Sequence, residues 1–171
     1  ETCAQSAYHE ACPLCLVQAH SSNRGACHLR ANPYAHDFGS TESEGKAKVV
    51  IESQDLIAAI DSTGLCVFTL HAGESPEHYA AQVDAACGGG WDVARLLETG
   101  ERVWNLERQF NIAAGLDAQH DTLPKRILEE PAPSGAAKGL VAKLPEMLPQ
   151  YYEMRGWSKD GKPENDTLSR L

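Results

Sequence analysis

The stretch from Asp92 to Ala114 most strongly constrains the fold of this chain, because its apolar residues recur at the spacing of an α-helix. Asp92 is typical of the residue that caps a helix N-terminus, and Gly115 is typical of a residue that ends one. The stretch therefore predicts one long helix with an apolar inner face and a charged outer face. The inner face is predicted to hold Val93, Leu96, Leu97, Val103, Trp104 and Phe110, and the outer face Glu98, Glu101, Arg102, Glu107 and Arg108.

Two further helices are predicted before this one. Residues 46–60 have helical periodicity, and residues 61–64 supply the turn chemistry that ends such a helix. Ser75 and Pro76 are typical of an N-cap and a first helical position, and the glycines at 88–90 end the helix that follows. For the helix over 46–60, the predicted inner residues are Val49, Val50, Leu56, Ile57 and Ile60, and the predicted outer residues are Lys46, Glu52 and Gln54.

The rest of the chain adds helices and irregular segments but no strand pattern of any length. Residues 1–45 read as an irregular arm. Residues 116–139 contain prolines and glycines that favour a wrapping segment with one short helix. Residues 145–155 predict a final helix, bent at Pro149 and ended by Gly156. The predicted fold is all-α: an irregular N-terminal arm followed by four or five helices with a Pro-rich wrapping segment.

Length and charge limit the function classes. A chain of 171 residues suits one domain, at ~100–200 residues per domain. Fifteen Lys and Arg against 24 Asp and Glu give a net charge of −9, which argues against binding nucleic acid or an anionic membrane. No apolar stretch approaches the ~20 residues that span a bilayer. The sequence begins at Glu1 without a secretory signal pattern, so we expect a cytoplasmic protein that is either a mature product or a piece of something longer.

Six cysteines leave more than one interpretation open. Free and mostly buried thiols are favoured, because unpaired cysteine packs as a small apolar residue, and Cys87 is predicted to be core. Cys12 and Cys15 form a lone Cys-x-x-Cys pair, which with Cys3 and Cys66 makes a candidate four-thiolate metal site. Five histidines are predicted to lie at the surface or to be partly buried: His20, His36, His71, His78 and His120.

Two polar clusters interrupt the helical background. The cluster Ser21–Arg30 combines arginines, whose planar donors suit phosphate and carboxylate oxygens, with His28, which can exchange a proton near neutral pH. Its alternative interpretation is an N-cap followed by a polar helix start. In the cluster Asp61–Phe68, Asp61 could accept hydrogen bonds from a heterocyclic ligand, and Cys66 could ligate a metal. The alternative there is a capping aspartate and a buried structural cysteine.

These two clusters carry a family resemblance. Residues 23–28, Asn-Arg-Gly-x-Cys-His, and residues 61–66, Asp-x-x-Gly-Leu-Cys, resemble the C-terminal domain of tungsten-containing aldehyde ferredoxin oxidoreductases. The similarity covers residues 21–171 as one C-terminal helical domain of a larger enzyme, whereas residues 1–20 diverge. Further similar segments follow in the family's order: 100–111 resembles its long helix, 121–131 its wrapping segment, and 145–157 its closing helix.

The resemblance implies a larger protein with a β-rich domain and two helical domains. The full enzyme would bind one tungsten, or molybdenum in some relatives, through two pyranopterins, and one 4Fe–4S cluster. It would oxidise an aldehyde and water to a carboxylate and reduce ferredoxin. Both cofactors would be absent from this chain alone, which is then expected to be inactive. Its partners would be the remaining domains of the same enzyme, with a homodimer as a candidate assembly.

The resemblance also implies roles for five residues. Cys66 matches the fourth cysteine ligand of the cluster, and Asp61 matches an aspartate that hydrogen-bonds a pterin. Leu65 would contact that pterin through its backbone, and Arg30 stands where a basic residue neighbours it. His28 would lie near the tungsten as the catalytic residue for proton transfer or substrate orientation.

Two other functions stay open on the sequence. One is a non-catalytic, free-standing domain that docks a partner subunit, which predicts an exposed apolar face around residues 21–30 and 61–68. The other is a small metal-binding module that uses the N-terminal cysteines.

Overall fold

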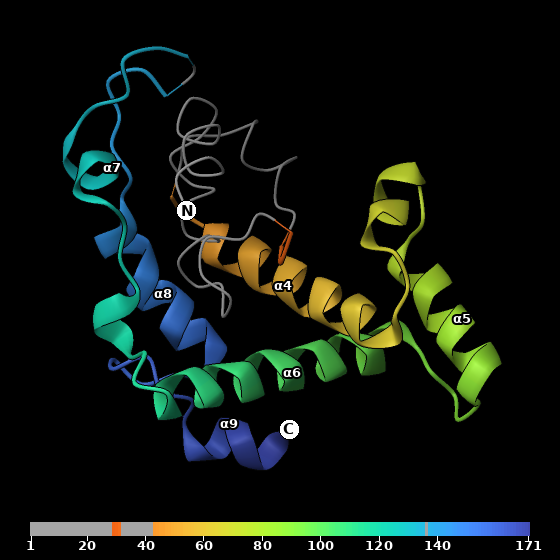
Figure 1. The fold of residues 1–171 in the computed structure, drawn as a ribbon. Helices are drawn as coiled ribbons and strands as arrows, with labels where there is room; N and C mark the ends of the chain where they lie inside the picture. The colour runs from red at the N-terminus through yellow and green to blue at the C-terminus, as the bar shows by residue number, and fades with distance from the viewer. Residues whose placement is uncertain (1–28, 32–42, 136) are drawn as a thin grey trace.

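The regular structure of this chain is helical. The computed structural model describes residues 29–31, 43–135 and 137–171, and within these ranges no strand occurs, only two isolated bridges, Ala132 to Lys138 and Trp157 to Pro163 (Figure 1). The all-α prediction is confirmed. Its helices are α4 (Lys46–Thr63), α5 (Pro76–Cys87), α6 (Val93–Ala113), α7 (Lys125–Glu129), α8 (Leu144–Arg155) and α9 (Asn165–Arg170), with two 3₁₀ helices, η1 (Val67–Ala72) and η2 (Ala118–His120).

The helix ends follow local chemistry, and most of the predicted boundaries are confirmed. Asp92 caps α6 by accepting a hydrogen bond from the backbone N–H of Arg95 at 2.8 Å. Pro76 is the first residue of α5 after the N-cap Ser75. Gly156 ends α8 in the left-handed conformation, φ 66°, which glycine adopts at little cost.

Figure 1 shows α4 and α6 side by side along the middle of the molecule, with α8 beside the start of α4 and α5 at the far end. At Gly100, α6 approaches the α4 backbone so closely that a Cβ atom would lie 1.8 Å from the carbonyl oxygen of Asp55. Trp104 of α6 and Tyr151 of α8 are almost fully buried where these helices meet, and the Trp104 indole N–H donates to the Tyr151 hydroxyl at 2.9 Å.

The other two parts of the core lie at either end of this centre. At one end, Ile60 of α4, Tyr79 of α5 and Leu96 of α6 belong to one buried cluster. At the other end, Ile127 of α7 and Met147 of α8 belong to a second buried cluster, through which the wrapping segment packs against α8. Because α4 reaches from the centre to the first of these clusters, its final turn is held on the core (Figure 1).

Polar residues are buried between the helices, which corrects three outward-facing predictions. Gln54 is fully buried because its side-chain oxygen accepts hydrogen bonds from Tyr151 and Arg155, each at 2.8 Å. Arg108 is buried because its guanidinium donates to Asp121 and to the carbonyl of Gly161. Lys46 in the first turn of α4 is also buried and has an interaction partner.

Two inward-facing predictions and one boundary are wrong as well. Phe110 leaves 73% of its surface exposed, whereas Arg108, two residues earlier on the same helix, is buried, so Phe110 lies on the solvent-facing side of α6. Cys87 is exposed in the last turn of α5, a helix that buries only Tyr79 and Ala80. The helix ending at Arg155 is not the final one, since α9 follows and packs beneath α6 (Figure 1).

Within the described residues, no helix is both long and apolar enough to cross a membrane. His71, His78 and His120 are exposed, as expected for surface histidines. His20 and His36 lie outside the described residues.

Candidate functional site

The connection from α4 to α5 positions three of the predicted site residues. Asp61 lies in the last turn of α4, and Gly64 ends the helix in the left-handed conformation, φ 76°. The Thr63 hydroxyl donates to the Ile60 carbonyl at 2.7 Å and accepts from the backbone N–H of Leu65 at 3.1 Å. These contacts turn the chain sharply out of the helix, so that Leu65 and Cys66 follow Asp61 within one short segment.

Asp61 forms an ion pair with Arg30. The two residues come from the two polar clusters of the sequence and are 31 positions apart, so the structure brings the clusters together. Both side chains are partly accessible, at 23% for Arg30 and 34% for Asp61. The Nε atom of Arg30 is buried, and among the described residues it has no hydrogen-bond partner.

Cys66 presents an exposed thiol on a well-held backbone. Its carbonyl oxygen accepts a hydrogen bond from the Thr69 hydroxyl at 2.7 Å and one from the Tyr79 hydroxyl at 3.2 Å. Leu65 is half-buried against the cluster of Ile60 and Tyr79, and Phe68 beyond Cys66 leaves 58% of its surface exposed. The interpretation of Cys66 as a buried structural cysteine is therefore wrong, because its side chain points away from the core that holds its backbone.

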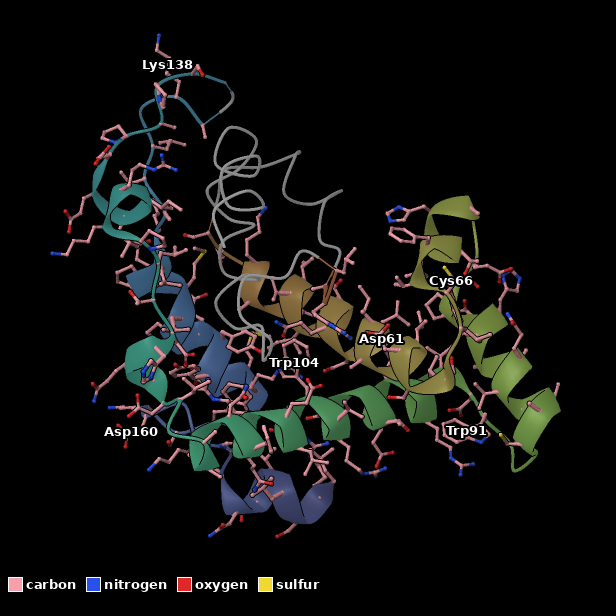
Figure 2. All side chains as sticks on the ribbon, viewed as in Figure 1. Asp61, Cys66, Trp91, Trp104, Lys138 and Asp160 are labelled. Carbon is pink, nitrogen blue, oxygen red and sulfur yellow. The ribbon has the colours of Figure 1, made fainter. Side chains whose placement is uncertain are left out.

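Asp61 and Cys66 lie toward the same end of the molecule, and Lys138 and Asp160 lie toward the other (Figure 2). A pocket of about 870 Å³ between α8 and residues 156–164 belongs to that other end, and none of the predicted site residues lines it. His28 lies outside the described residues, as do Cys3, Cys12 and Cys15. The proposed four-thiolate grouping of those three cysteines with Cys66 therefore stays a prediction.

Sequence reasoning missed two residues at this site. Neither Thr69 nor Tyr79 is identified from the sequence as a candidate site residue. The signal that was available is weak: a hydroxyl residue three positions after a cysteine is typical of a local side-chain to carbonyl bond. The Tyr79 contact spans 13 positions and depends on how α5 folds back, so no local pattern indicates it.

The residues present fit one quarter of a cluster site, not a whole one. Within the described residues, no three or more His, Cys, Asp or Glu side chains gather where they could hold a metal ion. One exposed thiol held by its backbone matches the donor chemistry of a single iron–sulfur ligand, since such clusters are bound by cysteine thiolates. The other ligands of such a cluster would come from outside the described part of the chain.

The fold and the site define an all-α domain that presents one exposed thiol and one ion-paired carboxylate on the same segment. Residues 7–171 match the family described as "Aldehyde ferredoxin oxidoreductase, domains 2 & 3". The chain belongs to this family.

Individual relatives agree with the family match. Tungsten-containing aldehyde ferredoxin oxidoreductases of Pyrococcus horikoshii, Pyrococcus furiosus and Thermococcus kodakarensis are each 45% identical to this chain over 161 residues. The aligned region covers 88% of this chain but 26% of each relative. The chain therefore spans about a quarter of the length of these enzymes.

Proposed function

We propose that this chain is the C-terminal part of a tungsten (or molybdenum) bis-pyranopterin enzyme that oxidises aldehydes to carboxylates. The names of its relatives support this activity and support ferredoxin as the electron acceptor. The remaining domains of the same polypeptide would complete the site, because the chain matches about a quarter of each relative. By itself the chain is expected to be inactive.

The observation that carries the proposal is the exposed thiol of Cys66, which follows Asp61 on one short segment at the end of α4. A thiolate at this position would be one of the four ligands of a 4Fe–4S cluster. When bound, the cluster would supply one-electron transfer, and the tungsten site would supply the two-electron chemistry that oxidation of an aldehyde hydrate needs. Phe68, two positions after Cys66, leaves 58% of its surface exposed and would supply an apolar neighbour to the bound cluster.

Asp61 and Arg30 would act on the pterin side of the site. A carboxylate accepts hydrogen bonds from the N–H groups of a heterocycle, and the guanidinium of Arg30 keeps the Asp61 carboxylate oriented. The backbone N–H of Leu65 is engaged by Thr63, so a contact between Leu65 and the pterin would use its carbonyl or side chain. His28 would transfer a proton during oxidation of the hydrate or orient the substrate.

The experiment compares two cysteine variants of the full-length enzyme. Cys66→Ser is expected to lower the iron content and change the electron paramagnetic resonance (EPR) signal of the reduced cluster, because serine is a poor ligand for iron in such clusters. Cys87→Ser is the matched control, since Cys87 is also an exposed free thiol of this chain and lies at the far end of α5. Its cluster should be unchanged.

Two results would contradict the proposal. One is an intact enzyme without tungsten or molybdenum by elemental analysis. The other is a Cys66→Ser variant whose iron content and spectrum match those of the wild type.

A further inference from the structure

We propose that Thr69 and Tyr79 are positioning residues that fix the backbone of Cys66 and thereby hold its thiol in place for the cluster. This inference rests on the proposed function, which makes Cys66 a cluster ligand. It adds two residues outside the Asp-x-x-Gly-Leu-Cys motif, one from η1 and one from α5.

The contacts converge on one atom. The carbonyl oxygen of Cys66 lies 2.7 Å from the Thr69 hydroxyl and 3.2 Å from the Tyr79 hydroxyl, and it also accepts the backbone N–H of Thr69 at 3.2 Å. The two hydroxyls are themselves within hydrogen-bond contact. Each hydroxyl can donate only one hydrogen bond. If one hydroxyl donates to the other, the second is left to donate to the Cys66 carbonyl, so at least one of them always donates to that carbonyl.

Tyr79 connects this carbonyl to the core. Its side chain is 1% exposed and belongs to the buried cluster of Ile60 and Leu96, so the ring cannot move without disturbing the packing. Cys66 comes from the segment before η1, and Tyr79 comes from α5, so the bond joins two elements rather than closing one turn. Figure 2 shows Cys66 between η1 and α5.

The arrangement separates the two halves of Cys66. Its backbone is bonded to a buried tyrosine, while its thiol is exposed. A ligand whose backbone is fixed in advance loses little conformational freedom when it binds metal, and hydrogen bonds near a cluster also tune its potential. Removing both hydroxyls should therefore weaken the attachment of the cluster and change its electronic properties, with little loss of packing.

The test uses the full-length enzyme with Thr69→Val and Tyr79→Phe combined, because both changes keep the shape of the side chain and remove only the hydroxyl. The measurements are the anaerobic rate at which an iron chelator removes cluster iron, and the midpoint potential and EPR spectrum of the reduced cluster. We expect iron loss to be about fivefold faster, the factor that one lost net hydrogen bond represents. The midpoint potential should also shift.

Tyr151→Phe is the matched control. It removes the hydroxyl of an equally buried tyrosine whose partners are Trp104, Gln54 and Arg155, in the centre of the fold. General destabilisation would raise the rate of iron loss in this control as much as in the double variant, whereas a positioning role would not. Thr69→Ser, which keeps the hydroxyl, should retain the wild-type rate and potential.

The outcomes separate this inference from the function on which it rests. If Cys66→Ser disrupts the cluster but the double variant behaves like Tyr151→Phe, the positioning role is overturned and the ligand role stands. If Cys66→Ser leaves the cluster unchanged, the ligand role fails and the positioning role with it. If the double variant does not fold, Thr69→Val alone against Thr69→Ser decides, because Thr69 is only partly buried.

Discussion

Gly100 on α6 faces the backbone carbonyl of Asp55 on α4, and a Cβ atom at Gly100 would lie 1.8 Å from that oxygen. A carbonyl of a helix backbone cannot rotate away, so Gly100→Ala would force the two helices apart. We expect it to lower the free energy of unfolding by about 3 kcal/mol or more. Alanine inside a helix otherwise stabilises a fold by ~1 kcal/mol relative to glycine. A loss of stability in Gly100→Ala, of any size, would therefore indicate the close contact.

Urea unfolding of the 171-residue chain measures this effect. Thr99→Ala is the control, because it places alanine at the neighbouring position of the same helix, and it should change the free energy by no more than about 0.5 kcal/mol. A Gly100→Ala variant as stable as the wild type would contradict the close approach.

Replacement of Arg108 by lysine tests the buried ion pair. The Arg108 guanidinium donates to both carboxylate oxygens of Asp121, at 2.9 and 2.5 Å, and to the carbonyl of Gly161 at 2.8 Å. Lysine keeps the charge but cannot reproduce this planar set of donors. We expect Arg108→Lys to cost about 2–3 kcal/mol of stability, because buried acceptors lose their donors.

Arg102→Lys is the matched control for that change. Arg102 lies on the same helix and is about half exposed, so its replacement should alter the free energy of unfolding by no more than about 0.5 kcal/mol. Equal effects of the two replacements would show that the Arg108 contacts do not stabilise the fold.

Asp55 gives the chain a specific dependence on pH. Burial raises the pKa of Asp55 from 3.8 to about 6, and the neighbouring Arg155 offsets only part of that rise. Between these two pH values the folded chain binds the Asp55 proton more tightly than the unfolded chain does. Stability from this group is therefore greatest at low pH, falls as the pH rises from about 4 to about 6, and is level above that.

The decline attributable to Asp55 is about 3 kcal/mol over this range. Measuring the free energy of unfolding against pH in the wild type and in Asp55→Asn isolates it, because other groups titrate in both proteins. The asparagine side chain does not titrate, so the profile of this variant should lack the decline, even though Arg155 loses the carboxylate that it contacts in the wild type at neutral pH. A wild type that gains stability relative to Asp55→Asn across this pH range would contradict the raised pKa.

Phe110 should tolerate a polar replacement. The ring leaves 73% of its surface exposed near the end of α6, so Phe110→Gln removes little buried apolar area. We expect a change of no more than about 0.5 kcal/mol in the free energy of unfolding. Leu96→Ala, at a position 1% exposed on the same helix, should cost about 2–5 kcal/mol.

The features that the sequence predicted are local ones. Asp92, Pro76 and Gly156 determine helix ends through their own backbone and the residues within one turn, so a single sequence contains what is needed. Local residues also determine where α4 ends. The helix continues three residues beyond the predicted end at Ile60, and Gly64 then ends it.

The features that the sequence did not predict depend on distant partners. Arg108 and Gln54 are charged or polar and were read as outward-facing, but Asp121 and Tyr151 give them buried partners that periodicity cannot indicate. At the site, the local polar cluster indicates Asp61 and Cys66 as candidates, and the resemblance to a family motif implies their roles. The pairing of Asp61 with Arg30, and the bond from Tyr79 to Cys66, required the tertiary fold.

The backbone contact at Gly100 has a mechanical consequence for the site. No side chain separates α4 from α6 there, so no change of rotamer can absorb a displacement of one helix relative to the other. Asp61 lies in the last turn of α4 and Cys66 follows five positions later, so both are coupled to α6 through the body of α4. A displacement of α6, such as contact with another domain on its exposed face would cause, would therefore move the Asp61 carboxylate and the Cys66 thiol together.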